Sequence, residues 1–250
     1  MKRMLLTAVT LLVGVWAAAQ VKDTTKVLLI GNSFTYYGNS HEKIAAIALS
    51  QGHKLDVRAE YVGGYTFSRH LRRDGTIKAI EIANPDSQYA FAFLQNQSQL
   101  HARYGSAPAR YKHVLADAKE LVGRIREYSP DAKIYLEQTW SFSKDDYGRF
   151  GSYENFDRLL KKGTCLLAKR THAFCSPIGD AFAIAREECP EIKIYHKDGK
   201  HQGDYGAYLK ACVNYLLIFR EPFTEDADPC GLDPKACAKL RSIAERVVLK

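Results

Sequence analysis

Short apolar runs alternate along the chain with longer stretches whose apolar residues recur at helical spacing. The run at 26–30 is continuously apolar and ends at Gly31, as a strand buried on both faces of a parallel sheet does. Further strands are predicted at 55–62, 89–94, 134–136 and 173–176, with a last strand-like run at 192–195. Helices are predicted around 44–52, and over 77–83, 108–128, 153–171, 181–187 and 205–219, with a final helix after Asp233 and Pro234.

This alternation of strands and helices predicts an α/β sandwich with a mainly parallel sheet. The polar, glycine-bearing stretch at 141–151 is expected to be a loop. No repeat, linker or low-complexity segment interrupts residues 20–250, so we expect a single domain. In such folds the functional residues lie in loops at the carboxyl ends of the strands, so candidate catalytic residues are expected there.

The first 19 residues have the pattern of a signal peptide. Lys2 and Arg3 precede an apolar run that is too short to span a membrane, and a small-residue cleavage signature ends at Ala19. No cysteine stands directly after that point, so a lipid anchor is not expected. We therefore expect an exported protein, periplasmic or secreted, with no membrane attachment after cleavage.

The chain carries a formal charge of +8, and residues 20–250 keep +6 once Lys2 and Arg3 are removed. The positive residues are scattered, apart from one cluster formed by Arg69, His70, Arg72 and Arg73. Such a cluster indicates either a solvated face or a surface for an acidic polymer. No nucleic-acid-binding motif accompanies it, so nucleic acid is not an expected partner.

All six cysteines lie in the C-terminal half, at positions 165, 175, 189, 212, 230 and 237. An even number in an exported protein is compatible with disulfides, and the sequence does not determine their pairing. Cys230 and Cys237 are the favoured pair, because a bond between them would close a short loop. Free buried thiols are the alternative, in particular for Cys165 and Cys212. No paired C-x-x-C spacing occurs, so neither zinc nor another metal or cofactor is expected.

Ser33 directly follows the first predicted strand, in the segment Gly31-Asn32-Ser33. A serine at this place either caps the next helix or presents its hydroxyl above the edge of the sheet as a nucleophile. Asp198 and His201 lie three residues apart in a glycine-bearing turn before a predicted helix. A carboxylate at this spacing can hold the imidazole in one tautomer, leaving the other ring nitrogen to act as a base on the serine.

With these motifs the chain resembles the SGNH/GDSL hydrolase family, in order, over nearly all of residues 20–250. The resemblance implies a three-layer α/β/α sandwich with a flavodoxin-like sheet. It also implies a metal-free ester hydrolase in which Ser33, His201 and Asp198 form the catalytic triad. The backbone N–H groups of Ser33 and Gly64 would donate to the oxyanion.

The third motif of the family, G-x-N-D, is altered here to Gln95-Asn96-Gln97-Ser98. Counting from the end of the strand, Gln97 stands where the asparagine belongs, and its amide is the favoured third oxyanion donor. Asn96 and Gln95 are the less favoured alternatives. A purely structural polar loop is a further possibility for this stretch.

Several other residues at strand ends are weaker candidates. A substrate-binding rim is proposed to include Asn32, Tyr65 and Trp140, with packing as the alternative role. Glu137, at the end of the fourth strand, is expected to have a buried structural role.

For the substrate, the resemblance and the leader suggest acyl groups, such as acetyl, on a carbohydrate. Small aryl esters and lipid esters remain alternatives. Two rival functions also stay open. One is a non-catalytic carbohydrate-binding protein on the same scaffold, which the altered third motif favours. The other is an O-acyltransferase that uses the same triad. The sequence does not determine the oligomeric state.

Overall fold

The structure is a computed structural model that describes residues 24–82, 85–144 and 147–250. The expected signal peptide at 1–19 lies outside these residues. Within the described part, five parallel strands form one sheet in the order β2-β1-β3-β4-β5. The strands are β1 (Thr25–Gly31), β2 (Leu55–Tyr61), β3 (Phe91–Leu94), β4 (Lys133–Glu137) and β5 (Phe174–Ser176). This is the flavodoxin-like order, in which the winding direction of the chain changes between β1 and β3.

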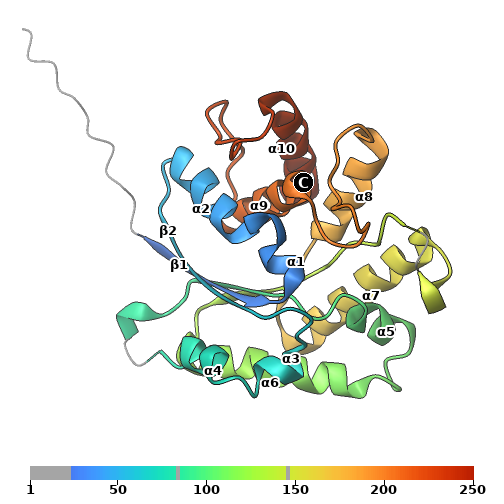
Figure 1. The fold of residues 1–250 in the computed structure, drawn as a ribbon. Coiled ribbons are helices and arrows are strands. Elements are labelled where there is room, and N and C mark those ends of the chain that lie inside the picture. The colour runs from blue at the N-terminus through green and yellow to red at the C-terminus, as the bar shows by residue number, and fades with distance from the viewer. Residues whose placement is uncertain (1–23, 83–84, 145–146) are drawn as a thin grey trace, which may run out of the picture.

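Helices cover both faces of the sheet (Figure 1). One layer contains α2 (Ser40–Ser50), α8 (Ile178–Glu188), α9 (Asp204–Phe219) and α10 (Pro234–Val248). The other contains α3 (Phe67–His70), α4 (Asp74–Ile80), α5 (Leu100–Ser106), α6 (Lys112–Tyr128) and α7 (Tyr153–Thr171). The three-layer α/β/α sandwich predicted from the sequence is thus confirmed.

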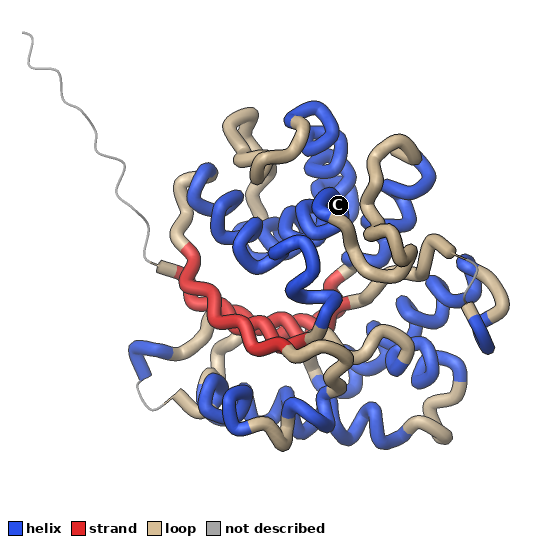
Figure 2. Tube along the Cα trace, in the orientation of Figure 1, coloured by secondary structure: helices blue, strands red, loops and turns tan. Residues whose placement is uncertain are grey.

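Alternate residues of the strands enter two separate cores, because successive side chains of a strand point to opposite faces. Val27 and Leu29 of β1 pack with the α2 and α9 layer, and Leu28 and Ile30 pack with the α6 layer. All four are buried. Figure 2 shows the central sheet between the two helical layers. No helix of the described residues has the length and apolar character needed to cross a membrane.

The predicted strand at 192–195 is wrong. Tyr195 makes only an isolated antiparallel bridge with Gln202, and the sheet ends at β5. Ile192 and Ile194 are apolar because they are buried in the helical layer that contains α8 and α9, so burial without strand pairing produced the misleading pattern.

Several helix boundaries also differ from the prediction. The helix predicted at 77–83 begins earlier, at Asp74, and ends at Ile80, while α8 begins at Ile178. The short α1 (Ser33–Tyr36), α3 and α5 were not predicted, since four to seven residues are too few to show helical periodicity. Short 3-10 turns occur at Tyr37–Asn39, Pro85–Ser87 and Gly148–Phe150, the last within the predicted loop.

All six cysteines are free thiols in the structure, so the predicted Cys230–Cys237 disulfide is not formed. The Cys230 sulfur lies 3.7 Å from the Asp228 carbonyl oxygen, and the Cys237 sulfur lies 3.7 Å from that of Pro229. The two cysteines are close in the sequence, but their sulfur atoms are not bonded, because each thiol points to a carbonyl group of the loop.

Candidate active site

A tight turn at the end of β1 places Ser33 at the carboxyl edge of the sheet. Gly31 ends the strand, and any side chain there would collide with Thr35 and with the Gln95 amide oxygen. Asn32 then caps α1, its side-chain oxygen accepting a hydrogen bond from the Phe34 N–H at 3.2 Å. The glycine and the cap together explain why the chain turns sharply enough to expose the Ser33 hydroxyl.

Asn32 connects this turn to two neighbouring loops. Its side-chain nitrogen donates to the Tyr65 carbonyl at 2.8 Å, and its backbone N–H donates to Gln95 Oε1 at 2.9 Å. Asn32 is only 2% exposed, and both polar atoms of its side chain are engaged. Asn32 therefore holds the loops around the site in place, and because it also lines the cavity at Ser33, its place in a substrate rim stays a prediction. Tyr65 is half-buried, and its place in a rim stays a prediction.

Ser33, His201 and Asp198 form a continuous hydrogen-bonded chain. His201 Nε2 lies 2.8 Å from Ser33 Oγ, and His201 Nδ1 lies 2.6 Å from Asp198 Oδ2. The fold thus brings together groups that are 168 residues apart. The arrangement matches the geometry in which an imidazole removes a proton from a serine while a carboxylate orients the ring.

Asp198 is held in its ionised form. Burial alone would raise its pKa, but hydrogen bonds from the His201 ring and from the N–H groups of Lys200 and His201 outweigh that effect. The pKa of Asp198 consequently lies well below its usual range. A permanently charged carboxylate favours the N–H tautomer of His201 at Nδ1 and leaves Nε2 to accept a proton.

Aromatic rings fix the plane of the His201 imidazole. Tyr37 stacks on it with ring centroids 4.2 Å apart and an interplanar angle of 15°, and Phe34 contacts it at 5.1 Å. Gln202 secures Tyr37 by donating to its carbonyl oxygen at 2.9 Å. Neither Tyr37 nor Gln202 was predicted to support the histidine. The only feature of the sequence that pointed to Tyr37 was its position four residues after Ser33.

Trp140 supports the turn that carries Asp198 and His201. Its indole N–H donates to the Lys200 carbonyl at 3.0 Å, and its ring stacks between Phe34 and Phe182. It is 1% exposed, so its predicted place in a substrate rim is wrong. Nearby, the Ser143 N–H donates to the Gly199 carbonyl at 2.8 Å, which fixes the turn at a second point.

The three residues predicted to supply oxyanion donors, Ser33, Gly64 and Gln97, all line the cavity at Ser33. The backbone N–H groups of Ser33 and Gly64 donate to no acceptor within the described residues. Gln97 lines the same cavity as Ser33 and Gly64. Its Oε1 accepts from the Gln99 N–H at 3.0 Å, while its Nε2 has no partner among the described residues. The amide is therefore oriented through its oxygen, with its donor nitrogen unused.

The other two amides of this loop are in different situations. Gln95 is buried, its Oε1 accepts from the Asn32 N–H, and its Nε2 donates to the Asn96 carbonyl. Gln95 is thus excluded as an oxyanion donor. Asn96 Oδ1 accepts from the N–H groups of Phe67 and Gln97, but its Nδ2 is buried without a partner among the described residues. Asn96 does not line the cavity, so Gln97 remains the favoured donor.

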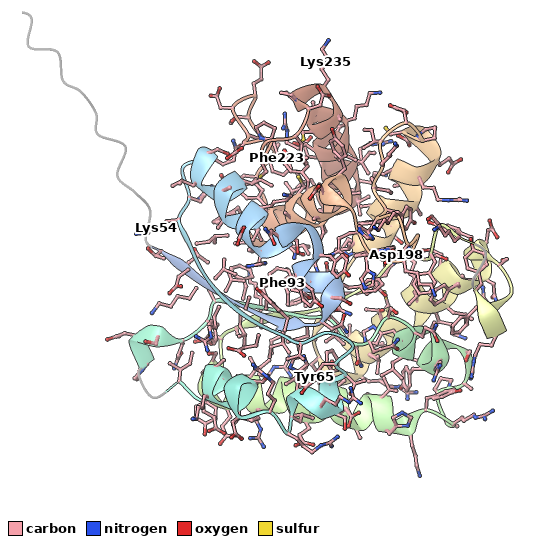
Figure 3. The ribbon with its side chains drawn as sticks, viewed as in Figure 1. Lys54, Tyr65, Phe93, Asp198, Phe223 and Lys235 are labelled. Carbon is pink, nitrogen blue, oxygen red and sulfur yellow. The ribbon has the colours of Figure 1, made fainter. Side chains whose placement is uncertain are left out.

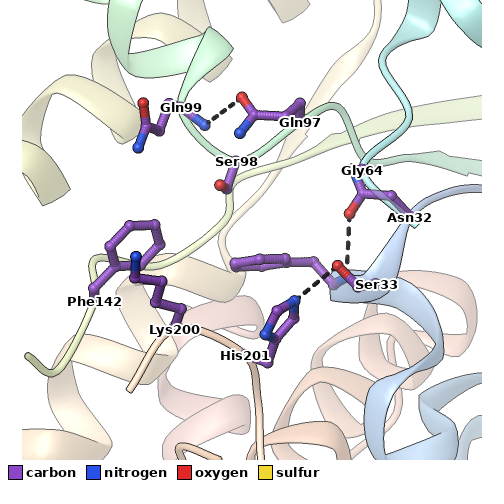
Figure 4. Close-up of a pocket in the computed structure, with 10 residues that line it drawn as sticks. Asn32, Ser33, Gly64, Gln97, Ser98, Gln99, Phe142, Lys200 and His201 are labelled. Atoms are coloured by element: carbon purple, nitrogen blue, oxygen red, sulfur yellow. Dashed lines mark hydrogen bonds between the residues drawn. The ribbon is translucent and has the colours of Figure 1, made fainter. Parts of the chain in front are cut away.

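The cavity in front of Ser33 has a volume of about 230 Å³ (Figure 4). Figure 4 shows His201 directed at Ser33, with Gln97 across the cavity from them. Its wall is completed by residues of five chain segments: Asn32, Phe34, Gly64, Ser98, Gln99, Phe142 and Lys200. The described residues contain no group of three or more histidine, cysteine or acidic side chains arranged to hold a metal ion.

A buried ion pair supports the turn that carries Ser33. Lys210 Nζ contacts Glu137 Oε2 at 2.6 Å and donates to the Phe34 carbonyl at 2.9 Å. The expected buried role of Glu137 is confirmed. Lys210 was missed, although its position within the apolar stretch at 207–218 indicated burial.

The cationic cluster at 69–73 does not form one open face. His70 is buried, and its ring nitrogens lie 2.9 Å from the Gly31 carbonyl and from the Thr76 hydroxyl. Burial lowers the pKa of His70, so the ring is neutral near pH 7. Arg73 pairs with Glu60 at 2.5 Å. Of the four residues of this cluster, Arg69 and Arg72 are the ones whose charged side chains are exposed at the surface.

Comparison with known proteins gives structural matches only. No family model matches the sequence, and no curated protein resembles it significantly. A DUF4886 family protein from Bacteroides uniformis has 21% identity and a TM-score of 0.76, covering 91% of this chain and 95% of its own. A protein described as a GDSL-like lipase from Parabacteroides merdae has 17% identity and a TM-score of 0.55, with 78% and 94% covered.

An acetyl xylan esterase from Geobacillus stearothermophilus has 15% identity and a TM-score of 0.55. The match covers 80% of this chain and 97% of the esterase. At these identities the matches establish the architecture alone. They agree with the strand order and with the layers described above, and the chain has the fold of the SGNH/GDSL hydrolases.

Proposed function

We propose that this protein is a serine esterase that removes short acyl groups, such as acetyl, from carbohydrates. The observation that carries the proposal is the chain of hydrogen bonds from Ser33 through His201 to Asp198 at the edge of a small cavity. The esterases among the structural matches support the same reaction class.

The proposed reaction begins when Ser33 Oγ attacks the ester carbonyl and His201 Nε2 takes the hydroxyl proton. The carbonyl π-electrons move to oxygen, and the N–H groups of Ser33 and Gly64 with the Gln97 amide stabilise the resulting oxyanion. The oxyanion collapses, the bond to the alcohol breaks, and His201 returns the proton to the leaving alcohol. Water then attacks the acyl-serine by the same route, which frees the acid and restores Ser33.

The size of the cavity supports a short acyl group. Pockets for drug-sized ligands usually measure roughly 300–1,000 Å³, whereas the space in front of Ser33 is about 230 Å³. Phe142 and Phe34 line it, so it offers apolar contact for a methyl group and little room for a long chain. Rates on p-nitrophenyl esters should therefore fall steeply from acetate to butyrate to octanoate. A maximum at octanoate would contradict the short-acyl assignment.

We also propose that the protein is exported after cleavage behind Ala19, which the sequence of residues 1–19 supports. Export would bring the enzyme to polymeric glycans outside the cell. The test is release of acetate from an acetylated polysaccharide such as acetylated xylan by residues 20–250, with the Ser33→Ala variant as the control. Acetate release by both proteins alike would refute Ser33 as the nucleophile.

A further inference from the structure

A second and larger cavity adjoins the turn that carries Asp198 and His201. Its volume is about 790 Å³. Two chain segments separate it from the cavity at Ser33: Phe142 and Lys200 line the smaller cavity, and their neighbours Ser143 and Gly199 line the larger one. The two spaces are thus adjacent, and consecutive residues of each segment line one space and then the other.

The side chains around the larger cavity are strongly basic. We call it the basic groove, after its lining residues Lys144, Arg186, Lys193, His196 and Lys197. No aspartate or glutamate of the described residues lines it. A concave surface with charge of one sign attracts ligands of the opposite sign more strongly than scattered surface charges do.

Two acidic residues close to the groove in the described part of the chain are paired with cations outside it. Glu188 pairs with Arg246 at 2.5 Å, and Glu191 pairs with Lys239 at 2.7 Å. The two cationic partners lie on α10. Lys193 and Lys197 are exposed and form no ion pair within the described residues. Their ammonium groups are thus available to a ligand.

Other contacts give the groove a defined shape. Lys144 Nζ donates to the Lys197 carbonyl at 2.6 Å, which joins its two sides. The Tyr195 hydroxyl donates to the Ser141 carbonyl at 2.9 Å, so the half-buried ring is fixed in the groove wall. The Arg186 guanidinium lies 4.1 Å from the centre of the Tyr153 ring. A fixed aromatic ring beside cationic side chains suits a sugar ring that carries a negative charge.

The groove reaches the catalytic carboxylate. His196, in its wall, has Nδ1 at 3.6 Å from Asp198 Oδ2, the oxygen that His201 contacts at 2.6 Å. A polymer with one residue in the groove would therefore have the next residues close to the cavity at Ser33.

We propose that the basic groove is a subsite for the anionic groups, carboxylate or sulfate, of an acidic glycan whose ester is cleaved at Ser33. The proposal rests on the esterase function proposed above and specifies its substrate class. A lipid surface fits less well, because the exposed large apolar side chains of the described residues are Leu49 and Phe174, neither of which lines the groove.

The test is a binding measurement by titration calorimetry with the whole of residues 20–250. The carboxylate probe is oligogalacturonate, compared with its neutral methyl ester, and the sulfate probe is dextran sulfate, compared with dextran. At least one anionic probe should bind about tenfold tighter than its neutral counterpart, and higher ionic strength should reduce the difference. Equal affinity within both pairs would overturn the proposal.

Two double variants separate the groove from general charge attraction. The Lys193→Gln/Lys197→Gln variant should lose most of the preference for the anionic probe. The control, Lys119→Gln/Lys235→Gln, changes the net charge equally at exposed positions outside the groove, and should keep the preference. Figure 3 shows Lys235 well away from Asp198. Equal losses in both variants would contradict a specific subsite.

This result is independent of the esterase assignment. Hydrolysis of p-nitrophenyl acetate by the wild type, and its loss in Ser33→Ala, tests the reaction without an anionic group. Preferential binding of the anionic probe without hydrolysis would refute the esterase function but leave the proposed subsite standing. Hydrolysis without preferential binding would refute the subsite but leave the esterase function standing.

Discussion

Lys210 and Glu137 form an ion pair at 2.6 Å in which each side chain is only 3% exposed. The same lysine donates to the carbonyl of Phe34, the residue after Ser33, and Asn214 donates to the other carboxylate oxygen of Glu137 at 3.1 Å. One buried cation thereby connects helix α9, the end of β4 and the backbone of the turn that carries Ser33. The position of Ser33 therefore depends on two charges that are buried in the core.

Replacing Lys210 with methionine should destabilise the fold strongly, because Glu137 would remain buried without its cation. Removal of one partner of a buried pair costs about 3–5 kcal/mol, and urea unfolding would measure the loss. The Lys210→Met/Glu137→Gln variant should recover part of it. As a control, Lys239→Met breaks the exposed pair with Glu191 and should change the stability little, because solvent screens that pair. Similar losses for Lys210→Met and Lys239→Met would contradict the account of the buried pair.

Replacing Asp198 with asparagine should leave the fold intact and reduce turnover by about 10⁴-fold, as in other serine triads. The amide would favour the wrong tautomer of His201, so that Nε2 could no longer accept the Ser33 proton. The measurement is kcat on p-nitrophenyl acetate, with circular dichroism to confirm folding. A folded variant with wild-type turnover would remove Asp198 from the mechanism.

Gln97→Ala should reduce kcat by about 10²- to 10³-fold if its Nε2 donates to the oxyanion, with little change in KM. Gln99→Ala is the matched control, because it removes a side chain of the same size and chemistry from the wall of the same cavity. Asn96→Ala tests the remaining alternative. A large loss in Asn96→Ala with none in Gln97→Ala would move the third donor to Asn96.

His101 should make the stability of the protein depend on pH. The ring is fully buried, and burial lowers its pKa to about 4. Its Nδ1 lies 2.9 Å from the Thr164 hydroxyl, while its Nε2 has no partner among the described residues. A proton added at Nε2 would therefore be a buried charge without an acceptor.

In the unfolded chain His101 binds a proton near pH 6.5, and in the folded protein only near pH 4. The unfolded state therefore gains protons first as the pH falls. Stability should decrease from about pH 6.5 to about pH 4, by about 3 kcal/mol from this group, with no further loss from it below. The His101→Phe variant should lack this part of the slope in urea unfolding. Identical slopes in the two proteins would contradict the assignment.

The sequence predicted most of the architecture because long periodic segments carry a strong signal. The continuous apolar run before Gly31 and the helical spacing around Leu121 each correspond to an element of the structure. The run at 192–195 was misread because burial of Ile192 and Ile194 in the helical layer has the same pattern as a strand. Short helices such as α1 lack the length that a periodic pattern requires.

In the site, the predicted triad residues come together, but their supports could not be foreseen. Trp140 and Asn32 were candidates for a rim, since polar and aromatic residues at strand ends can face either substrate or protein. The stacking of Tyr37 on His201 depends on the approach of two segments more than 160 residues apart, which no local pattern encodes. The same is true of Lys210 beneath Phe34.

The most direct test of the central claim is hydrolysis of p-nitrophenyl acetate by residues 20–250, measured beside the Ser33→Ala variant. The account predicts turnover by the wild type and a loss of at least about 10³-fold in a variant that remains folded. Equal turnover by the two folded proteins would show that Ser33 is not the nucleophile and would contradict the proposed mechanism.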